Sequence, residues 1–317
     1  MNVTVAICTW NRATLLDQTL AAMANLIIPS GIEWELLVVD NNGTDNTDEV
    51  VARHSRRLPL RMLREERKGK SNAANLALDS SAGELILWTD DDVLVEPEWL
   101  TRFAEAADRH PEAAIFGGVI DPWFPEPPDP ELVAAFPALA NGFCGLDHGI
   151  EEGPLPADAQ VWGANMGFRR SAVAGIRFDT TLGPSPMAIT TNGRTSHLSV
   201  GGGEEVRFIR SVQERGGEVV WVPSMRLRHY VAPERMRLGY LSASYTEKGR
   251  ILVRESGVPS GPRLLGTPRW VLKKWLEARA RSATCLWSGR RIEGLTWLRK
   301  ACYYQGIFHE CRAARQD

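Results

Sequence analysis

Short apolar runs alternate with segments of helical periodicity throughout the first 120 residues, and this alternation constrains the fold more than any other feature. The runs are rich in β-branched residues and bounded by turn-forming residues, which is typical of buried strands. Five strands interleaved with four helices predict an α/β fold with a doubly wound, mostly parallel, Rossmann-like sheet. The expected strands are Val3–Thr9, Trp34–Val39, Leu60–Leu63, Leu85–Trp88 and Ala113–Ile120, and the expected helices are Thr14–Asn25, Asp45–Arg56, Lys70–Leu78 and Pro97–His110.

The fourth apolar run ends in three consecutive carboxylates, Asp90, Asp91 and Asp92. Like charges this close repel each other unless a cation or hydrogen bonds compensate them. Hard divalent ions such as Mg²⁺ and Mn²⁺ prefer carboxylate oxygens and can share them with the phosphates of a substrate. Ligands of open α/β sheets bind at the carboxyl ends of the strands, so the run predicts a metal–diphosphate site. The alternative is a structural Asp-rich turn or helix N-cap.

The sequence lacks the two common phosphate-binding loops. No Gly-x-Gly-x-x-Gly follows the first strand, and no Walker sequence is found. A doubly wound sheet nevertheless usually binds a nucleotide. We therefore expect the polar ends of the first, second and fourth strands to hold it.

The periodicity weakens after the fifth strand. Pro122–Pro137 is proline-rich and predicts a crossover loop, whereas Leu182–Gly203 is polar and glycine-rich and predicts a long functional loop. We expect one domain over residues 1–233, with a nucleotide-binding half (1–121) and an acceptor half (122–233), and a helical C-terminal extension over 234–317. Further expected elements are strands at Val161–Phe168 and Val219–Val222 and a helix at Glu204–Gly216.

The composition is that of an ordinary globular protein, with 44% hydrophobic and 24% charged residues. A net charge of −2 argues against a nucleic-acid partner, because such proteins carry clustered basic surface. The five cysteines include no Cys-x-x-Cys pair, which argues against a disulfide framework or zinc site and favours a reducing cytoplasm. We recognise no signal peptide, and no apolar run approaches the ~20 residues that span a bilayer.

The charge is unevenly distributed along the chain. Residues 262–317 hold twelve Lys/Arg against four Asp/Glu, so this tail carries +8 and the remainder −10. Its basic residues are interleaved with Trp and Tyr. Basic amphipathic helices with interfacial aromatic residues bind anionic membranes, so one hypothesis is peripheral contact with the inner face of the membrane by an otherwise cytoplasmic protein. The alternative is a helical cap whose Trp side chains pack on the core.

Six motifs within residues 3–230 together resemble the family 2 glycosyltransferases, which have a GT-A fold and use nucleotide-sugar donors. The resemblance implies a hexosyltransferase-like enzyme that moves a sugar, with inversion, from a nucleoside-diphosphate sugar to a hydroxyl of a glycan or lipid-linked acceptor. A UDP-sugar is the expected donor. The motifs are Val5–Arg12, Val38–Asp45, Gly69–Asn75, Thr89–Asp92, Gly163–Arg170 and Gly203–Glu205.

The same resemblance implies a donor site at the strand ends. Asp40 ends the second strand and is expected to accept a hydrogen bond from the uracil N3–H. For the basic side chains, a solvated loop is the alternative. The residues expected to contact the donor are Thr9, Asn11, Arg12, Asp40, Asn42, Lys70, Asn75, Asp90 and Asp91.

The metal ligands are expected from the alternation of an extended chain, which places Asp90 and Asp92 on one side and Asp91 on the other. We expect Asp92 to bind Mn²⁺ or Mg²⁺ directly and Asp90 to contact the ribose or the metal. His229 follows the last core strand, where GT-A enzymes often complete the metal shell with a histidine. An imidazole ligand suits Mn²⁺ better than Mg²⁺. A structural role is the alternative for His229.

Glu205 stands where the family has an aspartate base, and it is expected to deprotonate the acceptor, with Glu204 as second choice. Two adjacent carboxylates can raise one pKa towards a useful value. The alternative is that both only serve the N-terminus of the following helix. Trp162 and Asn165 are expected to line the acceptor pocket, although Trp162 also fits a core position.

Two other functions remain open at this stage. A degenerate, non-catalytic sugar-nucleotide binder would fit the Asp-to-Glu departure at the base. A nucleotidyltransferase fits less well, because it needs a glycine-rich phosphate loop near the N-terminus, and this sequence has none there.

Overall fold

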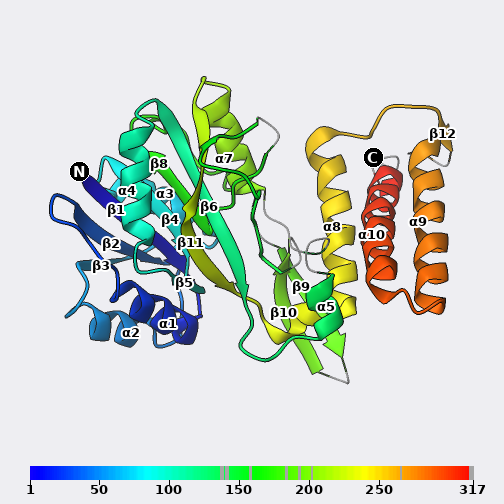
Figure 1. Cartoon of the computed structure of the whole chain (residues 1–317), viewed down its shortest axis with the longest axis horizontal. Helices are drawn as coiled ribbons and strands as arrows, with labels where there is room; N and C mark the ends of the chain where they lie inside the picture. The colour runs from blue at the N-terminus through cyan, green and yellow to red at the C-terminus, as the bar shows by residue number, and fades with distance from the viewer. Residues whose placement is uncertain are drawn as a thin grey trace. The chain divides into compact units, whose positions relative to one another are not determined.

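The structure is a computed structural model that describes residues 1–135, 139, 143–156, 159–182, 185–191, 194–200, 203–264 and 266–313. The chain forms two compact units (Figure 1). The second unit takes two segments of the predicted acceptor half in addition to the C-terminal extension, so the domain boundary at residue 233 stays a prediction. The first unit comprises Met1–Trp123, Gly145–Gly183 and Gly202–Tyr230, and the second comprises Phe124–Cys144, Pro184–Gly201 and Val231–Asp317.

A sheet of nine described strands forms the centre of the first unit: β1 (Asn2–Thr9), β2 (Glu33–Asp40), β3 (Leu60–Arg64), β4 (Leu85–Asp90), β5 (Val93–Val95), β6 (Ala113–Trp123), β7 (Gly153–Pro154), β8 (Asn165–Arg169) and β11 (Glu218–Tyr230). Eight follow the order β3-β2-β1-β4-β8-β6-β11-β5, and β7 pairs with β11. Strands β5, β7 and β8 are antiparallel to their neighbours, and the other six run parallel. The predicted doubly wound, mostly parallel sheet is therefore confirmed.

Helices cover both faces of this sheet: α1 (Ala13–Met23), α2 (Thr47–His54), α3 (Lys70–Ser80), α4 (Trp99–Arg109) and α7 (Glu204–Gln213). Successive side chains of a strand point to opposite faces, which divides the core into two layers. Val5 and Ile7 of β1 pack in the layer that contains α1, α2 and α4. Ala6, between them, packs in the layer with α3 and α7.

The strand register brings three polar strand ends to one edge of the sheet. In β1 and β2, Thr9 lies opposite Asp40. In β1 and β4, Cys8 lies opposite Asp90. Because these strands are parallel, their carboxyl ends meet at one edge, where a doubly wound sheet binds its ligands.

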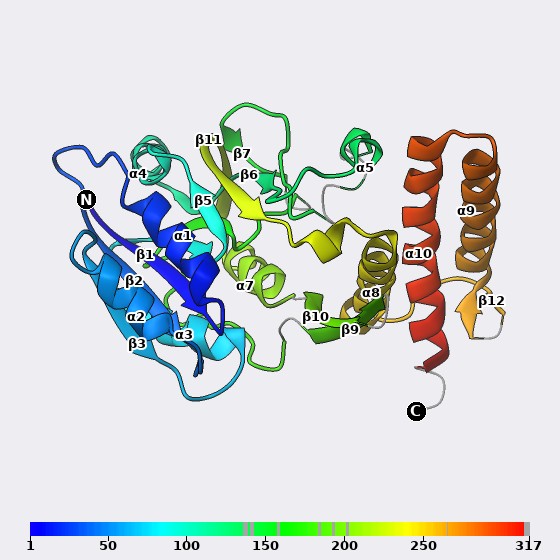
Figure 2. The same ribbon diagram turned by 90° about the horizontal axis from the view of Figure 1, so that it is seen from below.

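The second unit is mostly helical. Its described elements are α5 (Pro130–Ala134), β9 (Ser185–Thr191), β10 (Arg194–Val200), the 3-10 helix η2 (Pro233–Met236), α8 (Leu238–Ser256), β12 (Arg263–Leu264), β13 (Thr267–Pro268), α9 (Arg269–Trp287) and α10 (Arg291–Ala313). Within this unit α10 lies between α8 and α9 (Figures 1 and 2). The helical character predicted beyond Glu234 is confirmed.

Two glycines set the close approach of α8 and α10. A Cβ atom on Gly306 would lie 1.9 Å from the carbonyl oxygen of Thr246. A Cβ on Gly249 would lie 2.0 Å from the carbonyl oxygen of Tyr303. Any larger residue at either position would therefore force the two backbones apart.

Two predicted loops contain regular structure. Within Leu182–Gly203, which was expected to be a loop, β9 and β10 pair antiparallel. Asn192 and Gly193 lie outside the described part of the chain. In the sequence, Asn-Gly between two extended runs is a hairpin signal, and it outweighs the polar composition that favours a loop. Within Pro122–Pro137, α5 begins with Pro130 in its first turn, a position where proline suits a helix.

Two strands differ from their predicted bounds. The strand expected at Val161–Phe168 begins only at Asn165 and is antiparallel. The strand expected at Val219–Val222 is thirteen residues long and reaches Tyr230, with a register shift between Val222 and Arg226. Pro223 lies within this shift, where a proline without a backbone N–H is tolerated in a strand.

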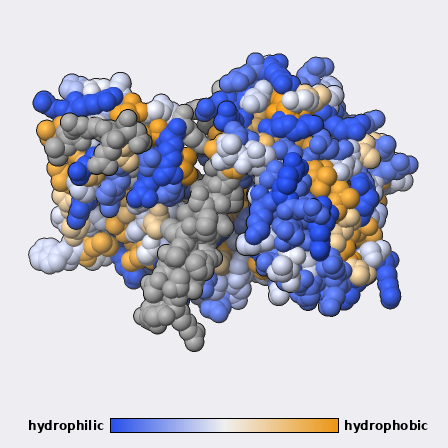
Figure 3. Space-filling model, turned by 180° about the vertical axis from the view of Figure 1, so that it is seen from behind, coloured by the Kyte–Doolittle hydropathy of each residue, from blue (hydrophilic) through white to orange (hydrophobic). Residues whose placement is uncertain are grey.

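The surface contains no large apolar area on the face shown in Figure 3, where hydrophobic residues emerge in small patches among hydrophilic ones. In the described part of the chain, every helix is too short or too polar to cross a lipid bilayer.

Candidate active site

The acidic triplet lies at the carboxyl edge of the first unit's sheet. Asp90 ends β4, and Asp91 and Asp92 form the turn into β5. Asp91 and Asp92 are buried, whereas Asp90 is partly exposed. Three carboxylates this close remain charged only if cations or donors surround them, and each has such neighbours.

Asp90 and Asp92 turn towards His229 near the end of β11. His229 Nε2 lies 3.5 Å from Asp90 Oδ2 and 3.4 Å from Asp92 Oδ1. One possible ligand atom from each residue falls within a 4.8 Å cluster. The ring position is set by a 2.9 Å hydrogen bond between Nδ1 and the carbonyl oxygen of Tyr230. A carbonyl only accepts, so Nδ1 carries the proton, and the neutral ring presents the Nε2 lone pair.

This cluster fits a divalent cation. Among the described residues, Asp92 Oδ1 accepts no hydrogen bond although it is buried. A buried carboxylate oxygen without a donor is costly unless a cation neutralises it. Two carboxylates and one imidazole form a donor set suited to Mn²⁺ and, with fewer nitrogen ligands, to Mg²⁺.

Asp91 faces the opposite direction, as the alternation predicts. Its Oδ2 accepts a 2.7 Å hydrogen bond from the hydroxyl of Thr9, and its Oδ1 pairs with Arg12 at 2.9 Å. Arg12 also contacts Asp92. Burial raises the pKa of Asp91 to about 6, and Arg12 opposes that rise. Asp91 therefore holds Arg12 in place rather than facing the metal cluster.

Lys70, the first residue of α3, joins the metal cluster to the candidate base. Its Nζ lies 3.1 Å from Asp90 Oδ1 and 2.9 Å from Glu205 Oε1. Burial would lower the pKa of Lys70, but Asp90 and Glu205 outweigh this effect and raise it well above its usual value. Burial likewise raises the pKa of Asp90, yet the charge of Lys70 reverses the shift and holds it well below its usual range. The ion pairs thus stay charged at neutral pH.

Glu205 and Glu204 begin α7, and their environments differ. Glu205 Oε2 accepts a 3.1 Å hydrogen bond from the backbone N–H of Gly163. Its side chain is 22% exposed, whereas Glu204 is 3% exposed as a residue. Burial and the neighbouring Glu205 raise the pKa of Glu204. Hydrogen bonds therefore orient the Glu205 carboxylate, which is partly accessible, whereas Glu204 is buried.

Asp40 is fully buried at the end of β2. Its Oδ1 accepts a 2.9 Å hydrogen bond from the N–H of Gly43. Its Oδ2 lies 3.1 Å from Arg64 Nη2, but no hydrogen bond among the described residues reaches this oxygen. The 3.1 Å contact is therefore an ion pair without hydrogen-bond alignment, and the oxygen can accept one more donor.

Asn11 and Asn42 shape the turns around Asp40. Both adopt left-handed backbone conformations, with φ of 53° and 60°. Asparagine tolerates this region better than most residues. The side-chain oxygen of Asn11 accepts a 2.7 Å hydrogen bond from the N–H of Thr44, which ties the loop after β1 to the loop after β2. Both side chains are exposed beside the predicted donor site.

The side chains of two predicted site residues are hydrogen-bonded to the backbone of other parts of the fold. Asn75 exchanges two 2.9 Å hydrogen bonds with the backbone of Phe178. Asn165 is fully buried, accepts from the Trp99 indole and donates to two backbone carbonyls. Both amides are therefore engaged by the fold, and the roles of Asn75 as a donor contact and of Asn165 as an acceptor contact stay predictions. Trp162 is half-buried and packs against the core beside Gly163.

Sequence reasoning missed three parts of the site. Arg64 ends β3 beside Asp40, and strand order alone could have placed it there. Thr19 of α1 accepts from the N–H of Val93 and donates to the Asp91 carbonyl, which fixes the acidic turn. Gly163 leaves space for Glu205, because a Cβ there would lie 2.3 Å from its Oε1. Nothing in the sequence identifies these last two contacts.

Comparisons with known proteins agree with this geometry. The family model described as Glycosyl transferase family 2 matches residues 4–177, more than half of the chain. The succinoglycan biosynthesis protein ExoM of Rhizobium meliloti (strain 1021) is 25% identical over 258 residues, which cover 79% of this chain and 74% of the relative. Other curated relatives match over shorter segments, and the aligned region spans 19% to 36% of their lengths.

Two solved structures share the fold. The mannosyltransferase PcManGT of Pyrobaculum calidifontis, in complex with GDP-Man and Mn²⁺, has a TM-score of 0.61 at 18% identity and covers 99% of this chain and 88% of its own. The S. aureus TarS 1-349 structure in complex with UDP-GlcNAc has a TM-score of 0.54 at 15% identity, with coverage of 100% and 92%. Since the family model spans residues that form the strand ends of the acidic site, the chain belongs to glycosyl transferase family 2 and is a glycosyltransferase with the GT-A fold.

Proposed function

We propose that this enzyme transfers a sugar, with inversion, from a nucleoside-diphosphate sugar to an acceptor hydroxyl, using a divalent metal and a carboxylate base. One observation carries the proposal: Lys70 joins the Asp90–Asp92–His229 cluster to Glu205, with Nζ contacts of 3.1 Å and 2.9 Å. This contact supports a site in which the groups proposed for leaving-group charge and for proton removal both come within reach of one bound donor sugar.

The acidic cluster is proposed to bind the donor's diphosphate through the cation. Asp92 and His229 would hold Mn²⁺ or Mg²⁺, with Asp90 as a third ligand or a ribose contact. The bound cation would supply Lewis-acid stabilisation of the charge that develops on the departing diphosphate. Lys70 and Arg12 add positive charge at the same edge. Such charges accelerate transfer because the leaving group is more negative in the transition state than in the donor.

Glu205 is proposed as the base, with Glu204 as second candidate. Its two oxygens are already oriented by Lys70 and by the Gly163 N–H. Removing the acceptor proton makes the hydroxyl oxygen a stronger nucleophile at the sugar's anomeric carbon. In a single displacement the nucleophile attacks opposite the leaving diphosphate, so the anomeric configuration inverts. The glutamate arm reaches one methylene further than the aspartate expected from the family.

A UDP-sugar is the proposed donor. Asp40 Oδ2 retains capacity for one donor, and the imide N3–H of uracil offers one. TarS 1-349 has been solved with UDP-GlcNAc, and PcManGT with GDP-Man and Mn²⁺. Both complexes contain nucleoside-diphosphate sugars, which supports the donor class, while the uracil preference rests on Asp40.

A glycan or lipid-linked glycan is the proposed acceptor. ExoM is named for succinoglycan biosynthesis, which supports a polysaccharide or glycoconjugate product. Trp162 beside Gly163 stays a candidate acceptor contact. We also propose that the protein works in the cytoplasm as a peripheral protein at the membrane's inner face, a proposal supported by the basic, Trp-containing α9 and α10.

Calorimetric titration of UDP, GDP and dTDP, each with and without Mn²⁺, tests the donor site. We expect Mn²⁺-dependent UDP binding that Asp92→Ala abolishes while the variant stays folded. No binding of any diphosphate by folded wild-type protein would contradict the proposal. NMR of the product's anomeric proton would then test inversion, and retained configuration would contradict a single displacement.

A further inference from the structure

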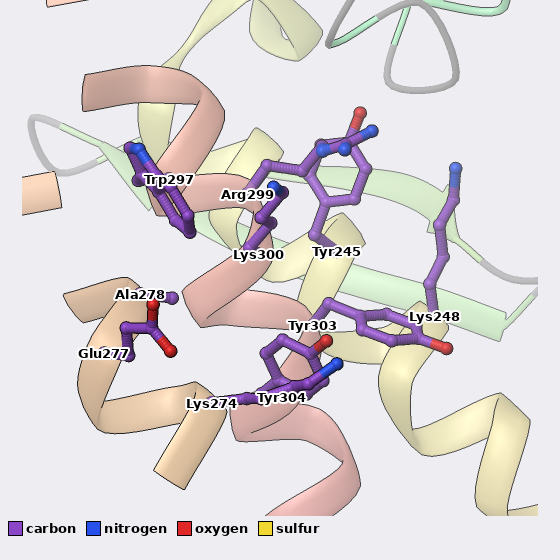
Figure 4. A pocket seen from close by; sticks show the side chains of 10 residues that line it. All are labelled: Tyr245, Lys248, Lys274, Glu277, Ala278, Trp297, Arg299, Lys300, Tyr303 and Tyr304. Carbon is purple, nitrogen blue, oxygen red and sulfur yellow. The ribbon is translucent and has the colours of Figure 1, made fainter. Parts of the chain in front are cut away.

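The second unit contains a pocket of about 550 Å³ between its three long helices (Figure 4). The side chains around it come from α8, α9 and α10, all within the second unit. A volume of this size is in the usual range for small-molecule sites. Neither the acidic cluster nor any predicted donor or acceptor residue lies in it.

The lining is unusually rich in cations. Lys248, Lys274, Arg299 and Lys300 line the pocket, and Glu277 is its one acidic lining residue. Glu277 is already paired with Arg281 at 2.9 Å. Among the described residues, no carboxylate lies within ion-pair distance of Lys274, Arg299 or Lys300. Lys274, Arg299 and Lys300 therefore bring positive charge to the pocket without a carboxylate partner in the described part of the chain.

Aromatic rings hold these cations in place. Lys274 Nζ lies 5.7 Å from the Trp270 ring centre and 5.9 Å from the Tyr304 ring centre. Lys248 Nζ lies 5.2 Å from the Tyr245 ring centre. A cation over an aromatic face gains electrostatic stabilisation without losing its charge. The rings thus orient these ammonium groups, and Lys274 has no carboxylate partner in the described part of the chain.

The same contacts argue against stacking of a neutral sugar. Trp297 is the largest ring of the lining, and two cations crowd it, Lys300 Nζ at 4.3 Å and the Arg281 guanidinium at 4.6 Å from its centre. A sugar would have to displace a cation to reach the ring. A multivalent anion would instead contact the cations directly.

We propose that this pocket binds a phosphate-bearing ligand, with a diphosphate or a phosphate monoester held by Lys274, Lys300, Arg299 and Lys248. A single carboxylate would neutralise only one of the four cations, whereas phosphate groups offer more charge and several acceptor oxygens. The site differs from the donor site of the proposed function, since it needs no metal and no carboxylate ligand.

The phosphate has two potential sources, and the surface of the same helical unit favours testing lipid first. Where α9 ends and α10 begins, Trp287 is 91% exposed, and Leu286 and Ile292 are exposed near it in the sequence. Arg290 and Arg291 lie between them in the sequence and pair with Glu293 and Asp129. Apolar and basic side chains together suit the headgroup region of an anionic membrane. The phosphate would then come from a lipid headgroup, and otherwise from a soluble phosphorylated compound.

The test uses full-length protein in EDTA, so that metal-dependent diphosphate binding at the donor site does not contribute. Sodium pyrophosphate is titrated by calorimetry, and phosphatidylcholine vesicles with and without phosphatidic acid are tested by flotation. The pocket variant is Lys274→Gln/Lys300→Gln. The matched control, Arg269→Gln/Lys273→Gln, removes two exposed charges of the same helical unit that do not line the pocket.

We expect the pocket variant to weaken pyrophosphate or phosphatidic-acid binding by roughly tenfold or more, because charged contacts to phosphate are strong. The control and Asp92→Ala should bind as wild type does. Binding only to phosphatidic-acid vesicles would assign a lipid source, and binding of pyrophosphate would assign a soluble one. If the double variant fails to fold, Lys274→Gln alone, at an exposed position, gives the same comparison.

Three results would overturn the proposal. Wild-type protein could bind neither pyrophosphate nor phosphatidic-acid vesicles. The control could lose as much binding as the pocket variant, which would show general surface attraction. Asp92→Ala could abolish pyrophosphate binding in EDTA, which would place the anion in the donor site. Because Asp92→Ala is also the donor-site test, failure of one proposal can be told apart from failure of the other.

Discussion

The acidic site of the first unit and the cationic pocket of the second unit stabilise clustered charges in opposite ways. In the acidic site, Arg12 and Lys70 each contact two carboxylates. In the pocket, Lys274 and Lys300 contact aromatic rings instead. A ligand of the acidic site must therefore compete with existing ion pairs, whereas a ligand of the pocket finds cations without carboxylate partners in the described chain. The first arrangement suits a reaction, and the second suits binding.

The largest expected effect comes from removing a metal ligand at the acidic site. Asp92→Ala should lower the rate of UDP release from a UDP-sugar by about 1000-fold, because charge on the leaving diphosphate loses its stabilisation. The assay is steady-state UDP release with Mn²⁺. Asp108→Ala, an exposed acidic position on α4, is the control and should retain wild-type rate. A residual Asp92→Ala rate above about a tenth of wild type would remove Asp92 from the metal site.

The next effect separates the two glutamates. Glu205→Gln should lower turnover by roughly 100- to 1000-fold, because the general base is lost while the side chain keeps its shape. Glu204→Gln should cost less than about tenfold, since Glu204 lies below the accessible surface. UDP binding, measured by calorimetry, should be unchanged in both. The reverse order of turnover would transfer the role of base to Glu204.

In the second unit, Gly306→Ala should lower the free energy of unfolding by about 1–3 kcal/mol, because the new Cβ would meet the Thr246 carbonyl. Gly239→Ala is the matched control within α8, where a Cβ meets nothing within 4 Å. Helix propensity predicts that this control stabilises by up to about 1 kcal/mol. Urea unfolding measures both. Equal effects would show that α8 and α10 do not depend on the glycine crossing.

The smallest expected effect is the pH dependence that the cationic pocket imposes. Burial lowers the pKa of Lys248 to about 8, and Arg299 and Arg235 add to the shift. Between pH 8 and the pKa of the unfolded state near 10.5, Lys248 binds more protons in the unfolded state than in the folded state. The free energy of unfolding therefore rises with pH across this range. The free-energy cost of burying the charged Lys248 side chain is therefore fully present below pH ~8, and it disappears towards pH ~10.5.

Lys248→Met removes that titration. Relative to wild type, it should stabilise the protein by on the order of 1 kcal/mol at pH 7, and the difference should vanish near pH 10.5. Urea unfolding across this range measures it. A difference that stays constant with pH would show that Lys248 is not desolvated.

The order of strands and helices in the first unit could be predicted because it depends on local periodicity. Five strands and four helices were placed correctly, and the alternation within the acidic triplet correctly separated Asp91 from its neighbours. The hairpin of β9 and β10 was missed, because its polar residues suggested a loop and the Asn-Gly signal was overlooked.

Contacts between distant parts of the chain could not be predicted from one sequence. Lys70 and Glu205 are 135 residues apart, and only the fold brings them together. Asn42 and Asn75 looked equivalent in the sequence, but Asn42 lies exposed at the site whereas Asn75 pairs with the Phe178 backbone. The same residue type can thus be engaged by the backbone or left exposed, and only the tertiary contacts decide which.

The glycine crossing of α8 and α10 makes the spacing of these two helices independent of the side chains around the pocket. Backbone contact at Gly249 and Gly306 fixes the distance between them, so the lining can change while the frame stays the same. Exchanging Lys274 or Lys300 for acidic or neutral residues would alter what the pocket accepts without moving either helix. The helical unit is therefore a scaffold on which new selectivity could evolve, or be designed, separately from the sugar-transfer site.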